Sequence, residues 1–245
     1  MVDIHCHILP GVDDGAVSWK MASDMCRMAA EDGIDHIVAT PHANHRYLHD
    51  RQTLSAALDR LRRLAGEHPQ LSLGCDFHFS FENLERALED PRRFVIGETR
   101  YLLLELSDFA VSGNTTANLQ RLMGAGFLPI ITHPERNMVL QHHPECVLPW
   151  VEAGSLVQVT ASSLTGRWGR VAERTAKWLL KHDAVHVLAT DAHDTNCRPP
   201  VLSEARRVAA RWLGEEVAAA LVSDNPRAIV AGQPVPYCPE PTHRC

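Results

Sequence analysis

Residues 2–15 read VDIHCHILPGVDDG, in which a short apolar run ends at His5-Cys6-His7 and leads into a polar turn. Six further short apolar runs follow along the chain, and most of them also end in polar residues. The seven strand candidates are residues 2–6, 36–40, 71–76, 101–106, 128–132, 155–160 and 186–190. Short apolar runs bounded by turn residues are typical of strands in a buried sheet.

Amphipathic stretches lie between these strand candidates, with apolar residues at helical spacing over residues 19–32, 53–67, 115–125 and 171–182. Strands that alternate with helices predict an α/β fold with a parallel sheet. Seven such units without a break in composition predict a distorted (β/α)7 TIM-like barrel, one strand short of the eight-stranded form. We expect a single domain over residues 1–232 and a Pro-rich, irregular tail over residues 233–245.

The composition narrows the classes of function. With 24 Lys and Arg against 30 Asp and Glu, the formal charge is -6, which gives little attraction for nucleic acid or anionic lipid. No apolar run approaches the roughly 20 residues that span a bilayer, so we expect no membrane insertion. The polar motif at Asp3 leaves no room for a signal peptide, which predicts a cytoplasmic location. The seven scattered cysteines form no C-x-x-C pair and do not indicate a zinc ribbon or a disulfide framework.

Ionisable residues gather at the carboxyl ends of the strand candidates. In a parallel barrel these ends share one face, where active sites are built from several strands. Residues two apart on a strand point the same way, so His5 and His7 can converge on one point, as can Asp191 and His193. Nine candidate metal ligands share this face: His5, His7, Asp14, His42, Asp76, Glu105, His133, Asp191 and His193.

Each of these residues has a simpler explanation when it is taken alone. A single histidine at a strand end is usually a hydrogen-bonded structural residue, and Asp13-Asp14-Gly15 could be only a turn. Five histidines and four carboxylates together are different, because closely packed buried charges are costly unless cations neutralise them. The sequence therefore predicts a metal site with several ions.

The ligand types indicate which ions the site would take. Imidazole and carboxylate without thiolate suit manganese, with iron or zinc as alternatives. Nine ligands suit up to three ions. Three divalent ions against four carboxylates leave a positive formal charge, so an anion such as phosphate is expected beside them. Arg136 and Arg198 would add guanidinium groups suited to phosphate oxygens.

These clusters together resemble the PHP (polymerase and histidinol phosphatase) superfamily. In particular they resemble its manganese-dependent protein-tyrosine phosphatases, which are linked to capsule and exopolysaccharide synthesis. The resemblance runs from Asp3 to about Arg198. It is carried by Asp-Ile-His-Cys-His-Ile-Leu-Pro-Gly-Val-Asp-Asp-Gly-Ala at residues 3–16, Thr-His-Pro-Glu-Arg at residues 132–136 and Thr-Asp-Ala-His at residues 190–193.

The resemblance implies a role for each matching position. Eight of the nine candidate ligands match the family's ligand positions, with Glu105 as the metal bridge, and Arg136 and Arg198 match its phosphate-binding positions. The ninth departs from the pattern, because the family has Glu where this chain has Asp76. The shorter side chain must reach its metal through a shift of the ion or through a water, and His78 is the alternative ligand.

The implied reaction is hydrolysis of a phosphate monoester by a metal-bridging hydroxide. The metals would hold the phosphate oxygens and lower the pKa of a bridging water, while Arg136 stabilises the transferring group. Glu105, Arg136 and Asp14 are then the candidate catalytic residues, and a general acid, if one acts, is expected among Asp14 and the histidines. The expected partner is a phosphotyrosine protein, namely a bacterial tyrosine kinase.

Other interpretations remain open at this point. A histidinol-phosphate phosphatase would share the metal centre and differ in its substrate pocket, and a non-catalytic metal-binding or kinase-docking subunit belongs to a different class. Cys238 and Arg244 fit the Cys-x5-Arg spacing of cysteine-dependent phosphatases. Pro239 and Pro241 supply no N–H groups to cradle a phosphate, so we interpret that spacing as chance.

Overall fold

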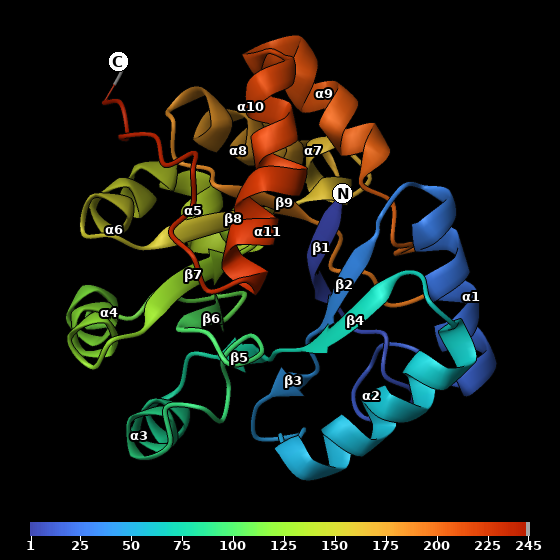
Figure 1. The fold of residues 1–245 in the computed structure, drawn as a ribbon. Coiled ribbons are helices and arrows are strands. Elements are labelled where there is room, and N and C mark those ends of the chain that lie inside the picture. Colours follow the sequence, from blue (N-terminus) through green and yellow to red (C-terminus); the bar gives the residue numbers. More distant parts are fainter. Residues whose placement is uncertain (244–245) are drawn as a thin grey trace.

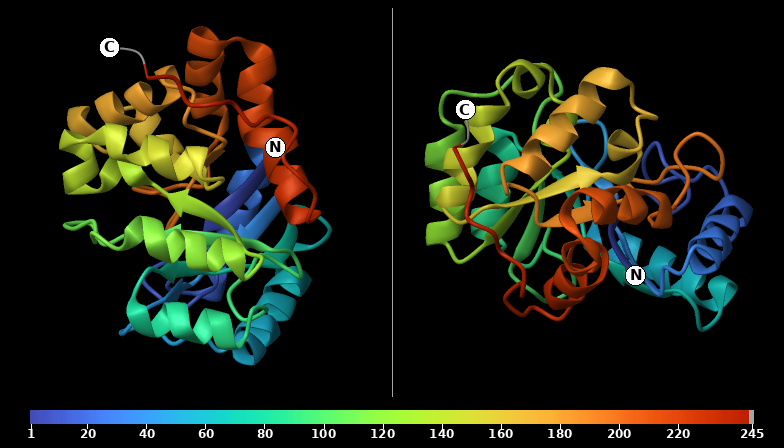
Figure 2. Two further views of the ribbon diagram at one scale, coloured as in Figure 1. Left: turned by 90° about the vertical axis from the view of Figure 1, so that its left-hand side faces the viewer. Right: turned by 90° about the horizontal axis from the view of Figure 1, so that it is seen from above.

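The computed structural model describes residues 1–243 and shows parallel strands surrounded by helices (Figures 1 and 2). The strands are β1 (Val2–Cys6), β2 (His36–Ala39), β3 (His42–Ala43), β4 (Gln70–Leu73), β5 (Asp76–His78), β6 (Tyr101–Glu105), β7 (Leu128–Thr132), β8 (Leu156–Thr160) and β9 (Val187–Ala189). The helices are α1 (Trp19–Glu31), α2 (Arg51–Ala65), α3 (Phe81–Glu89), α4 (Thr115–Gly124), α5 (Met138–His142), α6 (Leu148–Glu152), α7 (Ala161–Leu164), α8 (Arg170–Lys181), α9 (Ser203–Leu213), α10 (Glu215–Ala219) and α11 (Asn225–Val230). Three short helical segments complete the order: η1 (Pro134–Arg136), η2 (Pro144–Val147) and η3 (Ala220–Asp224).

The strand pairing confirms the predicted α/β class with parallel sheets. One sheet has the order β1-β2-β4, and the other has the order β3-β5-β6-β7-β8-β9. All of the pairs are parallel. The pairing does not close into one barrel among the described residues, so the predicted (β/α)7 barrel stays a prediction.

Two of the seven predicted strands, matched by β2 and β4, are each followed by a short separate strand after an interruption of two residues. Thr40 and Pro41 separate β2 from β3, and Gly74 and Cys75 separate β4 from β5. Hydrogen bonds still cross between these runs, because Gly74 N–H donates to Ala39 O at 2.8 Å and Asp76 N–H donates to Pro41 O at 3.2 Å. The chain therefore keeps its direction through both interruptions, and the following strands β3 and β5 carry His42 and Asp76.

The first strand and the last strand lie side by side. Asp191 N–H donates to His5 O, and His7 N–H donates to Ala192 O, each at 2.8 Å. The Asp3 carboxylate also accepts from the backbone N–H of Thr190 at 3.0 Å. These contacts join residues at opposite ends of the sequence. They place the ends of β1 and β9 next to each other.

Helix ends follow the local sequence. Asp50 caps α2 by accepting from Thr53 N–H at 3.2 Å, so the helix begins at Arg51, two residues before the predicted start. Ser18 caps α1 in the same way at the predicted start. No helix among residues 1–243 is both long enough and apolar enough to cross a membrane.

The Pro-rich tail has neither helix nor strand over residues 233–243. Tyr101 Oη donates to Gln233 O at 2.7 Å, and Thr242 N–H donates to His182 O at 2.9 Å. Tyr101 begins β6 and His182 follows α8, so the tail runs along the edge of the molecule where strands begin. Cys238 lies in this segment, away from the ends of the strands. Arg244, its partner in the Cys-x5-Arg spacing, lies outside the described residues.

Candidate metal centre

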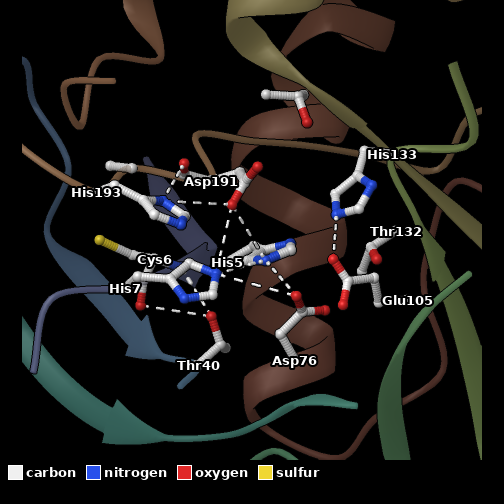
Figure 3. Close-up of polar contacts among 12 residues, drawn as sticks. His5, Cys6, His7, Thr40, Asp76, Glu105, Thr132, His133, Asp191 and His193 are labelled. Carbon is white, nitrogen blue, oxygen red and sulfur yellow. Dashed lines mark hydrogen bonds and ion pairs between the residues drawn. The ribbon is translucent and has the colours of Figure 1, made fainter. Parts of the chain in front are cut away.

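The predicted ligands lie close together at one end of the parallel strands, and Figure 3 shows His5, His7, Asp76, Glu105, His133, Asp191 and His193 among them. Strand register brings them together, because His42 of β3 pairs with Asp76 of β5, and His78 of β5 pairs with Glu105 of β6. His5 and His7 come from the end of β1, His133 follows β7, and Asp191 and His193 follow β9. The structure therefore brings these side chains together at one edge, as the sequence predicted.

His5 and His7 point their Nε2 atoms at each other, 3.2 Å apart. The other nitrogen of each ring faces an oxygen that accepts hydrogen bonds: His5 Nδ1 donates to Gln158 Oε1 at 2.9 Å, and His7 Nδ1 donates to Asp13 Oδ2 at 2.7 Å. In the neutral rings both Nε2 atoms then carry lone pairs rather than protons. Two lone pairs at this separation fit a shared cation.

Asp76 is a buried carboxylate that lacks hydrogen bonds. Its Oδ2 lies 3.0 Å from His42 Nδ1 and 3.6 Å from His5 Nε2. Neither of its oxygens accepts a hydrogen bond of good geometry among the described residues, and the residue is fully buried. Burying a carboxylate in this way is costly unless a cation is bound to it. The side chain predicted as the shorter substitute for Glu therefore has the surroundings of a ligand.

Seven of the nine predicted ligands fall into three overlapping groups that could hold metal ions. Within each group the donor atoms lie within 4.8 Å of one another. The groups are His7, Asp14, His42 and His193; His5, His7 and Asp76; and His42, Asp76 and Glu105. Three groups that share members fit the expectation of up to three ions. Asp76, rather than Glu105, is the carboxylate that two groups share.

The other two predicted ligands lie beside these groups. Asp191 Oδ1 is 3.4 Å from both His5 Nε2 and His7 Nε2, while its Oδ2 faces away from the histidines. His133 Nε2 is 3.8 Å from Glu105 Oε1. Both residues have a left-handed backbone, with φ of 34° at His133 and 51° at Asp191. Such strain in residues other than glycine is concentrated at functional sites.

The charges of this cluster favour positive charge at its centre. Burial lowers the pKa of His42, but the Asp14 and Asp76 carboxylates outweigh it and raise the pKa to about 12. Burial likewise opposes a proton on His7, whose pKa the Asp13 carboxylate raises to about 9. Burial and the neighbouring Asp76 raise the pKa of Glu105. The carboxylates thus repel each other and attract cations, as a metal centre requires.

The two predicted phosphate-binding arginines also converge. Arg136 ends η1 and Arg198 lies in the loop after β9, and both form ion pairs with Asp191 Oδ2. The Nε of Arg198 is buried without a partner among the described residues. Asp191 therefore faces the histidines with one oxygen and two guanidinium groups with the other, so it lies between the histidine cluster and the two arginines.

Sequence reasoning missed the residues that orient the ligands. Asp13, interpreted as a turn residue, holds His7 through its carboxylate and also accepts from His42 N–H at 3.2 Å. Gln158 of β8 holds His5, and its only signal was an amide within the otherwise apolar 155–160 run. His78 Nδ1 lies 3.6 Å from Glu105 Oε2 rather than in a predicted ligand group. Metal-ligating histidines need such partners to fix their tautomer.

The fold and this site together define an α/β protein with clustered histidines and carboxylates that could hold metal ions, beside two arginines. The chain belongs to the CpsB/CapC family of capsular polysaccharide synthesis proteins, whose family model matches residues 1–231.

Two curated relatives show how far the similarity extends. The chain is 31% identical over 239 residues to the tyrosine-protein phosphatase YwqE of Bacillus subtilis, covering 96% of this chain and 93% of that protein. It is 32% identical over 209 residues to the putative tyrosine-protein phosphatase CapC of Staphylococcus aureus, covering 83% and 81%. A solved structure from work on YwqE of Bacillus subtilis and CpsB of Streptococcus pneumoniae, described as metal-dependent tyrosine phosphatases, superposes with a TM-score of 0.91. That match has 30% identity and covers 100% of both chains.

Proposed function

We propose that this protein is a metal-dependent tyrosine phosphatase that hydrolyses phosphotyrosine in a protein substrate. The relatives are named as enzymes of this kind, and the family is one of capsular polysaccharide synthesis. The observation that carries the proposal is the convergence of three metal-ligand groups beside two guanidinium groups, joined by Asp191. This is the arrangement that a phosphate monoester bound across metals and arginines needs.

The metal ligands in this proposal are the nine predicted residues, and manganese is the proposed metal. Bound divalent cations would act as Lewis acids toward phosphate oxygens and lower the pKa of a water that attacks phosphorus. Imidazole and carboxylate donors without thiolate support manganese, with iron or zinc as alternatives. Gln158 and Asp13 keep His5 and His7 in the tautomer that leaves Nε2 free.

Arg136 and Arg198 are the proposed phosphate-binding residues. Asp191 holds both guanidinium groups from one side and leaves further N–H donors for phosphate oxygens. Asp14 lies at the exposed side of the cluster, where hydrogen bonds from His193 and His42 hold the pKa of its carboxyl below its usual range. We therefore assign Asp14 to metal binding first. The tyrosine phenolate is a fairly good leaving group and depends little on a general acid.

Closure of the strands into a barrel and the extent of the domain are also part of the proposal. We infer a distorted (β/α)7 barrel of the PHP type, formed as one domain by residues 1–232. One buried apolar cluster supports this barrel because it combines side chains from both sheets, among them Val2 of β1, Val38 of β2, Leu103 of β6, Ile130 of β7 and Val187 of β9. The isolated bridge between Cys6 and Ala192 supports closure of the ring.

The proposed substrate is the phosphotyrosine of a bacterial tyrosine kinase in capsule or exopolysaccharide synthesis. The proposed location is the cytoplasm. The free cysteines in the described part of the chain support this location, since Cys6, Cys26, Cys75, Cys146, Cys197 and Cys238 are unpaired there. Unpaired thiols are typical of a reducing compartment.

A substrate panel tests this function directly. Phosphotyrosine peptides and histidinol phosphate would each be assayed with manganese, iron and zinc. We expect manganese-loaded protein to hydrolyse phosphotyrosine best, chelation to abolish the activity and manganese to restore it. Preference for histidinol phosphate would favour the alternative phosphatase, and no hydrolysis at all would favour a non-catalytic subunit.

The thiol mechanism needs its own control. Cys238 is exposed and lies in the tail, so Cys238→Ser should leave kcat/KM within about twofold of wild type. A folded Cys238→Ser protein without activity would replace the metal mechanism with one that depends on cysteine.

A further inference from the structure

Trp168 lies against both of the arginines that the proposed function assigns to phosphate. The centre of its ring is 4.1 Å from Cζ of Arg136 and 5.3 Å from Cζ of Arg198. A guanidinium group is attracted to an aromatic face within about 6 Å of the ring centre. A single side chain therefore contacts two cations that come from different loops.

The backbone around Trp168 is held in place. Gly166 and Gly169 flank Arg167 and Trp168 with φ of 83° and 87°, which are conformations that favour glycine. Gly169 N–H donates to Gly166 O at 3.0 Å, and Arg167 N–H donates to Ser162 O at 2.9 Å. The turn between α7 and α8 is thus built to present the indole toward the arginines.

Two like charges held together need groups that offset their repulsion. Asp191 supplies a carboxylate from one side of the guanidinium groups, and the Trp168 ring supplies the negative face of its π system. The Trp168 residue keeps 39% of its surface exposed, whereas the arginine side chains are exposed by 15% and 23%. Trp168 is therefore only partly covered by its neighbours.

We propose that Trp168 is a positioning residue for Arg136 and Arg198 and also the surface on which the aryl ring of a phosphotyrosine packs. This inference rests on the proposed function. By fixing both guanidinium groups, the indole keeps their donors aligned for a phosphate. By offering an apolar, planar surface next to that phosphate, it favours aryl over alkyl phosphates.

The test compares Trp168→Ala, Trp168→Leu and Trp168→Phe with a matched control, Trp212→Ala. Trp212 is also exposed, at 52%, and its ring centre lies 5.3 Å from Nζ of Lys177, but it belongs to α9 and its cation contact is with a lysine that is not a predicted site residue. The first measurement is the affinity of manganese-loaded protein for inorganic phosphate. The second is the ratio of kcat/KM for a phosphotyrosine peptide to that for the same peptide with phosphoserine. Metal content is measured for every variant.

We expect Trp168→Ala and Trp168→Leu to bind phosphate about 3- to 30-fold more weakly, with metal content unchanged. Trp168→Phe retains an aromatic face and should stay within about threefold of wild type. The aryl preference should fall in the Ala variant and persist in the Phe variant. Trp212→Ala should match wild type in both measurements.

Separate outcomes distinguish the inference from the function on which it rests. Trp168→Ala within twofold of wild type in phosphate affinity and in aryl preference would overturn the inference and leave the phosphatase assignment standing. Wild-type protein that hydrolyses no phosphate ester would overturn the assignment. The phosphate-binding measurement would then still decide whether Trp168 positions the arginines.

Discussion

Three histidines of the proposed metal centre form a hydrogen bond through the same ring nitrogen, Nδ1. Nδ1 of His5, His7 and His193 faces Gln158 Oε1, Asp13 Oδ2 and Asp191 O, with a distance of 3.0 Å for the last pair. Each ring therefore presents Nε2 to the centre. A substitution of Gln158 or Asp13 would act on a metal ligand without touching the metal itself.

Asp76 is the proposed metal ligand whose loss should be easiest to measure. Its backbone is fixed between β3 and β6, so the carboxylate cannot move far. We expect wild-type protein to hold fewer than three metals, Asp76→Ala to lose one further equivalent and most activity, and Asp76→Glu to retain or raise the metal content. Elemental analysis beside aryl phosphatase rates checks this, with Asp24→Ala in α1 as a control. Full metal content and full rate in Asp76→Ala would make His78 the next candidate.

Arg136 should matter for catalysis more than for metal binding. Charge-assisted hydrogen bonds contribute about 1.5–3 kcal/mol, so Arg136→Ala should lower kcat/KM roughly 10- to 150-fold. If the guanidinium acts mainly in the transition state, Arg136→Ala should lower kcat and also raise KM. Arg136→Lys keeps the charge but loses the planar fork and should recover only part of the rate. An unchanged kcat/KM in Arg136→Ala would place Arg136 away from the phosphate.

At the scale of single residues, the sequence predicted the candidate metal ligands better than the residues that orient them. His5, His7 and His42 stand out because imidazoles cluster at strand ends. Gln158 and Trp168 do not stand out, since an amide in a strand and a tryptophan in a loop have many ordinary roles. Their contacts depend on which loops meet in three dimensions, and no local spacing encodes that.

Among the elements, the loop after β1 folds back onto the strand end. Ala16 N–H donates to His7 O at 3.0 Å, and Gly15 N–H donates to Asp13 Oδ1 at 3.0 Å. A Cβ at Gly15 would lie 2.0 Å from His7 O and 2.5 Å from His7 Cβ. Only glycine allows this approach, which also brings Asp13 to His7.

Gly15→Ala should therefore disturb the metal centre through the backbone. The added methyl group must push the loop away from His7, at a cost of about 1–3 kcal/mol in the free energy of unfolding. We also expect weaker manganese binding, because Asp13 would lose its hold on His7. Denaturant unfolding with and without manganese measures both effects. Gly113→Ala is the matched control, since a Cβ there meets nothing within 4 Å. Equal stability of the two variants would contradict this account.

The elements were predictable where periodicity is strong and less so where packing decides. The helix over residues 115–125 closely matches α4. The splits after β2 and β4 were not predicted, because the predicted 36–40 strand ends before β3 and the predicted 71–76 strand runs across Gly74 and Cys75. At the second split a Cβ on Gly74 would lie 2.9 Å from Val38 Cγ1, so this break reflects close packing between two strands.

For the whole molecule, His186 links stability to pH. It is fully buried, and its Nδ1 accepts from Val157 N–H at 3.1 Å, so protonation would break that hydrogen bond. Burial lowers its pKa to about 4. Because the unfolded chain binds a proton near pH 6.5, stability is complete above that pH and falls as the pH drops toward 4.

We expect the wild-type protein to lose about 2 kcal/mol of stability through His186 between pH 7 and pH 5. His186→Asn keeps an acceptor near the Nδ1 position and removes the titration, so its stability should depend less on pH. Denaturant unfolding of chelated protein at both pH values measures the difference, and the exposed His143→Asn serves as the control. The same pH dependence in all three proteins would show that His186 does not contribute.

The arrangement of the whole chain was predictable as an alternation of strands and helices, and its closure was not. Parallel strands follow from the alternation alone. The position of β9 beside β1 does not follow from the alternation. It depends on contacts of Asp3 and Thr190 and of the backbone of residues 5–7 and 191–192. These few contacts join residues that are far apart in the sequence, so no local pattern predicts them.

That contact between the first and last strands constrains when the metal centre can form during synthesis. Thr190 and His5 are separated by 185 residues, and contacts of such separation form late because the loop that they close is long. On the ribosome, His5 and His7 emerge long before Asp191 and His193 have been added. The complete set of proposed ligands can therefore come together only after His193 has left the exit tunnel, so the site cannot be completed before that point in synthesis.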